Sequence, residues 1–303
     1  MLSRLLVRTY ITFRRVVRAA VVRNPHVERL LGPYLVALEG FLPLHRLVRF
    51  APNPIVYDGH KIFHRPEDLG VILPLLFHSA YEPETTSWLK EFLKPGMTLV
   101  DCGAHIGYFT LLGARAVAPS GKVYAFEPEP STVEVLEQNV VCNGYGQVVE
   151  IIPKAVWSRT HRVRLFVDKR SSVSAKVFPH EPGQQHVEVD ATSLDDFFRG
   201  KGWPSVHVVK MDIEGAETAA CEGMKELSLR NPDMKLIVEV NFQNLVGTGV
   251  TLEKLFGSIQ ACGFSRFRVL WRRGSELELP REMSRLEALA RVVNVNLLCE
   301  KSV

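Results

Sequence analysis

Cysteine is scarce in this chain, and the cysteines that are present do not pair in the sequence. Five occur among 303 residues, scattered and without any C-x-x-C pair. This argues against a disulfide framework and against a zinc site, and it indicates a reducing compartment. No apolar run reaches about 18 residues, so no membrane-spanning helix is expected. The sequence therefore predicts a cytoplasmic protein.

Acidic residues are absent from the first 24 residues, which hold six arginines interleaved with apolar side chains. Residues 1–50 carry a net charge of +7, so the rest of the chain, whose total is +4, carries −3. Three interpretations stay open: a basic helix packed on its own domain, a helix on an anionic membrane surface, and a targeting segment. We expect residues 1–24 to bind an anionic membrane peripherally. Nucleic acid is not expected as a partner, because no RNA-binding motif is present.

The dinucleotide-binding pattern G-x-G-x-x-G is also missing. Instead, an apolar run over residues 97–100 leads into D-x-G-x-x-x-G, formed by Asp101, Gly103 and Gly107. The glycines allow a tight turn close to a ligand, and the acid repels a pyrophosphate but attracts an ammonium group. Twenty residues later, Glu127 ends the next apolar run, where a carboxylate accepts hydrogen bonds from two ribose hydroxyls. The pattern predicts S-adenosylmethionine as cofactor; the alternative is an ordinary strand–turn–helix without a ligand.

Further acids follow two later apolar runs, predicted as strands. Lys210, Asp212 and Glu214 come at the end of one run, and Glu239 comes at the end of the next. Ligands of open α/β sheets bind outside the carboxyl ends of the strands, so Lys210, Asp212 and Glu239 are candidates for catalysis. Asp212 or Glu239 can act as a general base, and Lys210 can lower the pKa of a hydroxyl or hold an acid in place. Alternatively, Asp212 and Glu214 cap the next helix and Lys210 pairs with one of them.

The chain divides by composition into a basic helical extension (residues 1–50), a lead-in hairpin and helix (51–95) and an α/β domain (96–303). Strands and helices alternate in the last part, which predicts parallel βαβ units. The expected strands of the main sheet are 97–100, 123–126, 148–152, 206–211, 236–240, 267–271 and 293–299. Two extra strands, 162–167 and 186–190, are joined by a polar loop over 168–185. This loop contains Arg170 and three serines, and we expect it to cover the acceptor side.

Taken together, these motifs resemble the FkbM-type S-adenosylmethionine-dependent methyltransferases. The resemblance rests on D-C-G-A-H-I-G-Y-F-T from Asp101, F-E-P at 126–128, T-S-L-D-D-F at 192–197, K-M-D-I-E-G-A-E at 210–217 and Y-E-P-E-T at 81–85. It covers the chain from about residue 80 onward. It implies an α/β class I methyltransferase fold, Rossmann-like, with a seven-stranded, mostly parallel sheet whose last strand is antiparallel. The N-terminal helical extension and an inserted β-hairpin would be additions to that fold.

The resemblance also implies roles for individual residues. Asp101, Gly103, His105 and Gly107 match the loop beside the methionine part of the cofactor, Glu127 matches the ribose-binding acid, Ala155 borders the adenine, and Glu82 belongs to a matching motif before the first strand. Two residues depart from the family pattern. His105 stands where an asparagine is usual, and Asn241 stands where a histidine is common.

The expected function is methyl transfer from S-adenosylmethionine to a hydroxyl of a sugar, glycolipid or secondary metabolite. Asp212, Lys210 and Glu239 are the expected catalytic residues. The acids could hold a divalent cation, but their spacing is not a recognised ligand pattern, so no metal ligand is assigned. Two other classes stay open: a catalytically silent, membrane-associated binding protein with a methyltransferase-like core, and a nicotinamide-dependent oxidoreductase.

Overall fold

The computed structural model describes residues 51–77, 80–168, 171–179, 184–270, 279, 281–291 and 294–302. The expected helical extension over residues 1–50 lies outside these residues, so its binding to a membrane stays a prediction. The chain forms two compact units, Met1–Pro83 and Glu84–Val303. Among the described residues, no helix is both long enough and apolar enough to cross a bilayer.

The described part of the first unit contains the predicted lead-in hairpin, which turns at Asp58 and Gly59. Strands β1 (Ile55–Tyr57) and β2 (His60–Ile62) pair in antiparallel fashion. Both turn residues have positive φ, 49° at Asp58 and 79° at Gly59, as a two-residue turn of the hairpin type requires. Helix α4 (Leu69–Phe77) follows.

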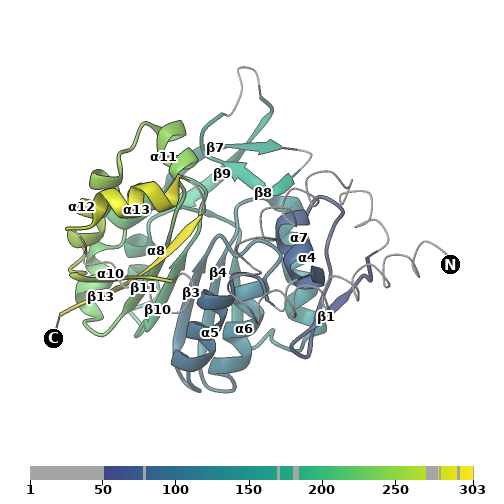
Figure 1. The fold of residues 1–303 in the computed structure, drawn as a ribbon. Helices are drawn as coiled ribbons and strands as arrows, with labels where there is room; N and C mark the ends of the chain where they lie inside the picture. The colour runs from purple at the N-terminus through teal and green to yellow at the C-terminus, as the bar shows by residue number, and fades with distance from the viewer. Residues whose placement is uncertain are drawn as a thin grey trace, which may run out of the picture. The chain divides into compact units, whose positions relative to one another are not determined.

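The second unit is built on a seven-stranded sheet with the order β12-β13-β11-β10-β3-β4-β5 (Figure 1). Its strands are β3 (Thr98–Cys102), β4 (Lys122–Phe126), β5 (Val149–Ile152), β10 (Val208–Met211), β11 (Lys235–Val240), β12 (Arg266–Val269) and β13 (Val295–Glu300). Strand β13 runs antiparallel to both of its neighbours, whereas the pairs from β11 to β5 are parallel. The predicted Rossmann-like sheet with an antiparallel last strand is therefore confirmed.

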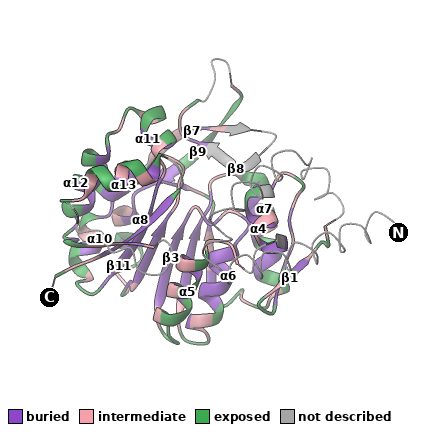
Figure 2. Ribbon diagram, in the orientation of Figure 1, coloured by how far each residue is buried: buried purple, intermediate pink, exposed green. Residues whose placement is uncertain are grey.

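Helices cover the sheet, and the strands between them are buried (Figure 2). The helices are α5 (Pro83–Phe92), α6 (Tyr108–Val117), α7 (Pro130–Cys142), α8 (Leu194–Gly200), α9 (Glu217–Glu222), α10 (Lys225–Arg230), α11 (Phe242–Thr248), α12 (Leu252–Gln260) and α13 (Met283–Ala290). Every residue of β3 and β10 is buried, which explains their nearly continuous apolar sequences. The chain order reverses at β3, which lies between β4 and β10, and this makes a switch point for ligand binding at the carboxyl ends of these strands.

The inserted segment forms a second sheet with the order β6-β9-β7-β8. Its strands are β6 (Ala155–Val156), β7 (His161–Asp168), β8 (Ser171–Lys176) and β9 (His186–Thr192). The inserted hairpin is confirmed, but the prediction of one polar loop over 168–185 is wrong, because β8 lies within it and pairs with β7. A serine-rich edge strand is held by backbone hydrogen bonds and shows no apolar alternation, so its sequence gives no strand signal. Arg170 lies outside the described residues.

Candidate functional site

The glycine turn between β3 and α6 lies against the end of β10. Gly103 has φ 81°, and a Cβ there would overlap the carbonyl oxygen of Asp212. Gly107 has φ 93° and is the N-cap of α6, and a Cβ there would lie 2.6 Å from a Leu136 methyl group. The positive φ favours glycine at both positions, and the backbone of Asp212 leaves no room for a side chain at Gly103. The turn therefore brings the end of β3 directly beside the loop that carries the second group of acids.

Glu127 is oriented by the backbone of this turn. The His105 N–H donates to Glu127 Oε2 at 2.9 Å, and the Glu129 N–H donates to Oε1 at 3.0 Å. His105 has φ 51°, a conformation that asparagine and histidine adopt more readily than most residues. Burial raises the pKa of Glu127, while the nearby His105 and the two N–H groups act to lower it. Each oxygen keeps a second lone pair for a ribose hydroxyl.

Asp101 is completely buried at the end of β3, and one of its oxygens accepts no hydrogen bond. Thr110 Oγ1 donates to Asp101 Oδ2 at 2.6 Å, whereas Oδ1 has no partner in the described part of the chain. Burial raises the pKa of Asp101, and the Lys210 ammonium acts against that rise. A buried carboxylate oxygen without a donor is costly. Beside the glycine turn it fits the cationic amino group of a bound ligand.

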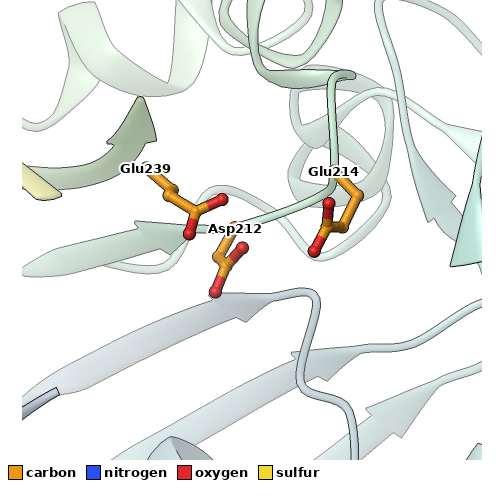
Figure 3. A group of neighbouring side chains, drawn as sticks. All are labelled: Asp212, Glu214 and Glu239. Atoms are coloured by element: carbon orange, nitrogen blue, oxygen red, sulfur yellow. The ribbon is translucent and has the colours of Figure 1, made fainter. Parts of the chain in front are cut away.

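Three carboxylates from neighbouring strand ends meet in what we call the acid group: Asp212, Glu214 and Glu239 (Figure 3). One oxygen of each lies within 4.8 Å of the others. Asp212 and Glu214 follow β10, and Glu239 lies in β11. The sequence predicted Asp212 and Glu239 at the ends of two strands. The structure pairs those strands and adds Glu214 to the group. Carboxylates this close repel one another unless a cation or ammonium groups balance their charge.

Two buried lysines supply positive charge to the acid group. Lys210 Nζ lies 3.1 Å from Asp212 Oδ2 and 4.5 Å from the centroid of the Phe109 ring. Lys176 Nζ, from β8, lies 3.4 Å from Glu214 Oε2. Burial raises the pKa of Glu214, the Asp212 carboxylate adds to that rise, and Lys176 opposes it. Lys210 therefore does pair with an acid, as one sequence interpretation held.

Neither Asp212 nor Glu214 caps a helix. Helix α9 begins at Glu217, and its N-cap residue makes no side-chain cap. The Glu217 carboxylate instead accepts the Ile213 N–H at 3.0 Å and the Gly215 N–H at 2.9 Å, so it holds the loop that carries the acid group. Sequence reasoning missed this role. Its only signal was an acid two residues after a glycine, because the contact depends on the shape of the loop.

Burial raises the pKa of Glu217 to about 7 from an ordinary value of 4.5. The folded protein then holds this proton more tightly than the unfolded chain does, so the free energy of unfolding falls as the pH rises from about 4.5 to 7. Glu217→Gln removes the titration. Relative to this variant, wild type should lose about 3 kcal/mol over that interval. Urea unfolding as a function of pH measures the difference, and the exposed Glu222→Gln should keep the wild-type slope.

The end of the inserted sheet rests on two glycines. A Cβ on Gly215 would lie 2.6 Å from the Phe178 ring, and a Cβ on Gly247, in α11, would overlap the same ring. Gly→Ala in a helix normally stabilises by about 1 kcal/mol, and we expect this gain for Gly257→Ala in α12, which faces open space. Gly247→Ala should instead destabilise by about 1–3 kcal/mol, because the methyl group displaces Phe178. Thermal unfolding compares the two; equal shifts would show that Phe178 is not seated there.

The two remaining predicted cofactor residues lie in different parts of the chain. Ala155 opens β6 and is buried with Leu165, Val189 and Ala191 in the core of the inserted sheet. Glu82 belongs to the first compact unit and has φ 41°. The roles of Ala155 and Glu82 beside the cofactor stay predictions.

Residues 101–266, more than half of the chain, match the Methyltransferase FkbM domain. The chain is 41% identical over 110 residues to "Protein-L-isoaspartate O-methyltransferase" of Aeropyrum pernix (36% of each chain), and 27% identical over 157 residues to "Methyltransferase sdnD" of Sordaria araneosa (42% of this chain, 60% of that one). The matched part of the chain thus spans between about a third and three fifths of the length of these relatives.

A solved structure of the FkbM methyltransferase from Methylobacillus flagellatus is 16% identical to the chain. The superposed part covers 76% of this chain and 52% of the Methylobacillus flagellatus chain, with a TM-score of 0.40. The match of residues 101–266 is what decides the family. The chain belongs to the FkbM methyltransferase family, whose methyl donor is S-adenosylmethionine.

Proposed function

We propose that the protein transfers the methyl group of S-adenosylmethionine to a hydroxyl of a sugar, glycolipid or secondary metabolite. One observation carries this proposal. The glycine turn and Glu127, which suit a nucleoside with a cationic head, lie beside an acid group that suits a hydroxyl acceptor. The contact between Gly103 and Asp212 joins the two halves at a single edge of the sheet.

The chain's own residues fit the cofactor. Asp101 Oδ1, to which no described residue donates, would accept hydrogen bonds from the ammonium of the amino-acid part, and Glu127 would accept them from the two ribose hydroxyls. The acid before the turn disfavours the pyrophosphate of a nicotinamide cofactor. When bound, S-adenosylmethionine supplies an electrophilic methyl group on a sulfonium.

A carboxylate of the acid group would take the acceptor's proton. As the acceptor oxygen forms its bond to the methyl carbon, the carbon–sulfur bond breaks with its electron pair left on sulfur, and the hydroxyl proton passes to the base. Asp212 suits this role best, because its side chain is 16% exposed and Lys210 engages only Oδ2. Glu239 is more deeply buried, and Asn294 donates to its Oε1 at 2.8 Å. A positioned base contributes roughly 10²–10⁴-fold to a rate.

The charge of the acid group favours a hydroxyl over a carboxylate acceptor. Some relatives are named protein-L-isoaspartate O-methyltransferases, so a carboxyl oxygen is the other acceptor to consider. Three carboxylates with two lysines keep a net negative charge when all are ionised. Such a group repels an anionic acceptor but accepts hydrogen bonds from the hydroxyls of a neutral one.

The proposal is tested in two steps with the full chain. Calorimetry should show binding of S-adenosylhomocysteine, the product form of the cofactor. Labelled S-adenosylmethionine should then transfer its methyl group to a component of a cell extract, identified by mass spectrometry. Absence of binding contradicts the cofactor site. Binding without any turnover would instead favour the catalytically silent binding protein.

A further inference from the structure

Lys176 is a buried cation that the inserted sheet contributes to the methyltransferase core. It ends β8, it is only 7% exposed, and its Nζ lies 3.4 Å from Glu214 Oε2. It also donates to Asn244 Oδ1 at 2.5 Å. Burying an ammonium group is costly unless its partners are well placed. Here the ammonium group of Lys176 is buried beside the acid group and contacts both Glu214 and Asn244.

Asn244 completes the arrangement from a third element. Its Nδ2 donates to Glu214 Oε2 at 2.8 Å, while its Oδ1 accepts from Lys176. Helix α11 therefore fixes the lysine and the carboxylate together. Two residues further along, Phe178 rests against Gly215 and Gly247, so the chain that carries Lys176 is fixed to the same loop and the same helix.

The charges around Glu214 explain why a cation is placed there. Glu214 shares the acid group with Asp212 and Glu239, and Lys210 engages Asp212. Lys176 is the cation that engages Glu214 among the described residues. Without it, Lys210 is the remaining lysine that pairs with the acid group in the part of the chain that the structure describes. Glu214 would then turn away or recruit a cation from solution.

We propose that Lys176 is a positioning residue of the acceptor side, which holds the Glu214 carboxylate beside Asp212 and Glu239 in place of a cation from solution. The inference rests on the proposed function, because it takes the acid group to be the acceptor side. It gives the inserted sheet a task in the reaction, because the sheet delivers to Glu214 a charge that the described residues of the seven-stranded core do not supply.

Three variants test this role. Lys176→Met removes the charge and keeps the apolar stem, and Lys176→Arg keeps the charge. Lys235→Met is the matched control, since Lys235 pairs with Glu300 at 3.1 Å and lies at the start of β11, away from the carboxyl ends of the strands. Each variant is titrated with S-adenosylhomocysteine and with Mn²⁺ alone, and each is assayed for methyl transfer to the cell extract.

We expect Lys176→Met to bind S-adenosylhomocysteine as wild type does, which also shows that it folds. Its methyl transfer should fall about 10²-fold through misplacement of the acid group. Its Mn²⁺ affinity should rise about tenfold or more, because the charge count of a site sets its cation affinity. Lys176→Arg should keep the wild-type rate of methyl transfer and the wild-type Mn²⁺ affinity, because it keeps the charge. Lys235→Met should match wild type in both measurements.

The inference is overturned if Lys176→Met keeps either wild-type transfer or wild-type Mn²⁺ affinity. A structural role alone would lower stability without tightening Mn²⁺ binding and without rescue by arginine. Failure of wild type to bind S-adenosylhomocysteine would count against the proposed function instead. Where no acceptor is present in the extract, the Mn²⁺ titration decides by itself.

Discussion

Glu127→Ala is expected to weaken the binding of S-adenosylhomocysteine about 10²–10⁴-fold. The Glu127 carboxylate is buried and oriented by two backbone N–H groups, so in our proposal it meets the ribose hydroxyls without further ordering. Each hydrogen bond to a charged group contributes about 1.5–3 kcal/mol, so two of them give about 3–6 kcal/mol. Isothermal titration calorimetry of the variant and of wild type measures the difference directly.

The control for this prediction is Glu134→Ala, an exposed glutamate in α7. It should bind the ligand as wild type does. Glu127→Gln is a second useful variant, because it keeps the shape of the side chain and one acceptor oxygen while replacing the other by a donor. Its binding should lie between that of Glu127→Ala and that of wild type. Wild-type affinity in Glu127→Ala would mean that the nucleoside binds elsewhere.

Asp212→Asn is expected to lower methyl transfer about 10²–10⁴-fold, the range that a positioned general base contributes. Asparagine keeps the size of the side chain but cannot take the acceptor's proton. Binding of S-adenosylhomocysteine should change little, because the proposed cofactor contacts lie at Asp101 and Glu127. The measurement is the rate of labelled methyl transfer to the extract component at saturating cofactor.

Asp233→Asn is the matched control, since Asp233 is exposed in the turn before β11. It should transfer methyl groups at the wild-type rate. Glu239→Gln gives a second comparison within the acid group. If Asp212→Asn retains full activity while Glu239→Gln loses it, Glu239 is the base and the assignment of Asp212 is wrong.

The local parts of the site could be predicted because local physics dictates them. A buried parallel strand needs an apolar run, and the turn after it needs residues that tolerate positive φ, so Gly103 and Gly107 could be identified in the sequence. Glu127 followed in the same way from the end of the next strand. The sheet order then placed the ends of β3, β4, β10 and β11 along one edge.

The parts that were missed depend on contacts between distant residues. Glu214 could be read as a helix cap until the structure placed Asn244, 30 positions away, against its carboxylate. Glu217 holds the loop through the Ile213 and Gly215 N–H groups, an arrangement that requires the folded shape of residues 213–217. Strand β8 could not be predicted, because its pairing with β7 depends on backbone hydrogen bonds, which the side-chain pattern does not encode.

The sequence by itself determined the Rossmann-like sheet, the glycine turn and the place of Glu127 after a strand, because apolar periodicity and glycine conformation are local properties. Only the tertiary structure decided that Lys176 and Asn244, 68 positions apart, join at Glu214. The physical reason is that a buried charge is tolerated only where its partners converge. That convergence depends on the docking of the inserted sheet, which no local pattern in the chain records.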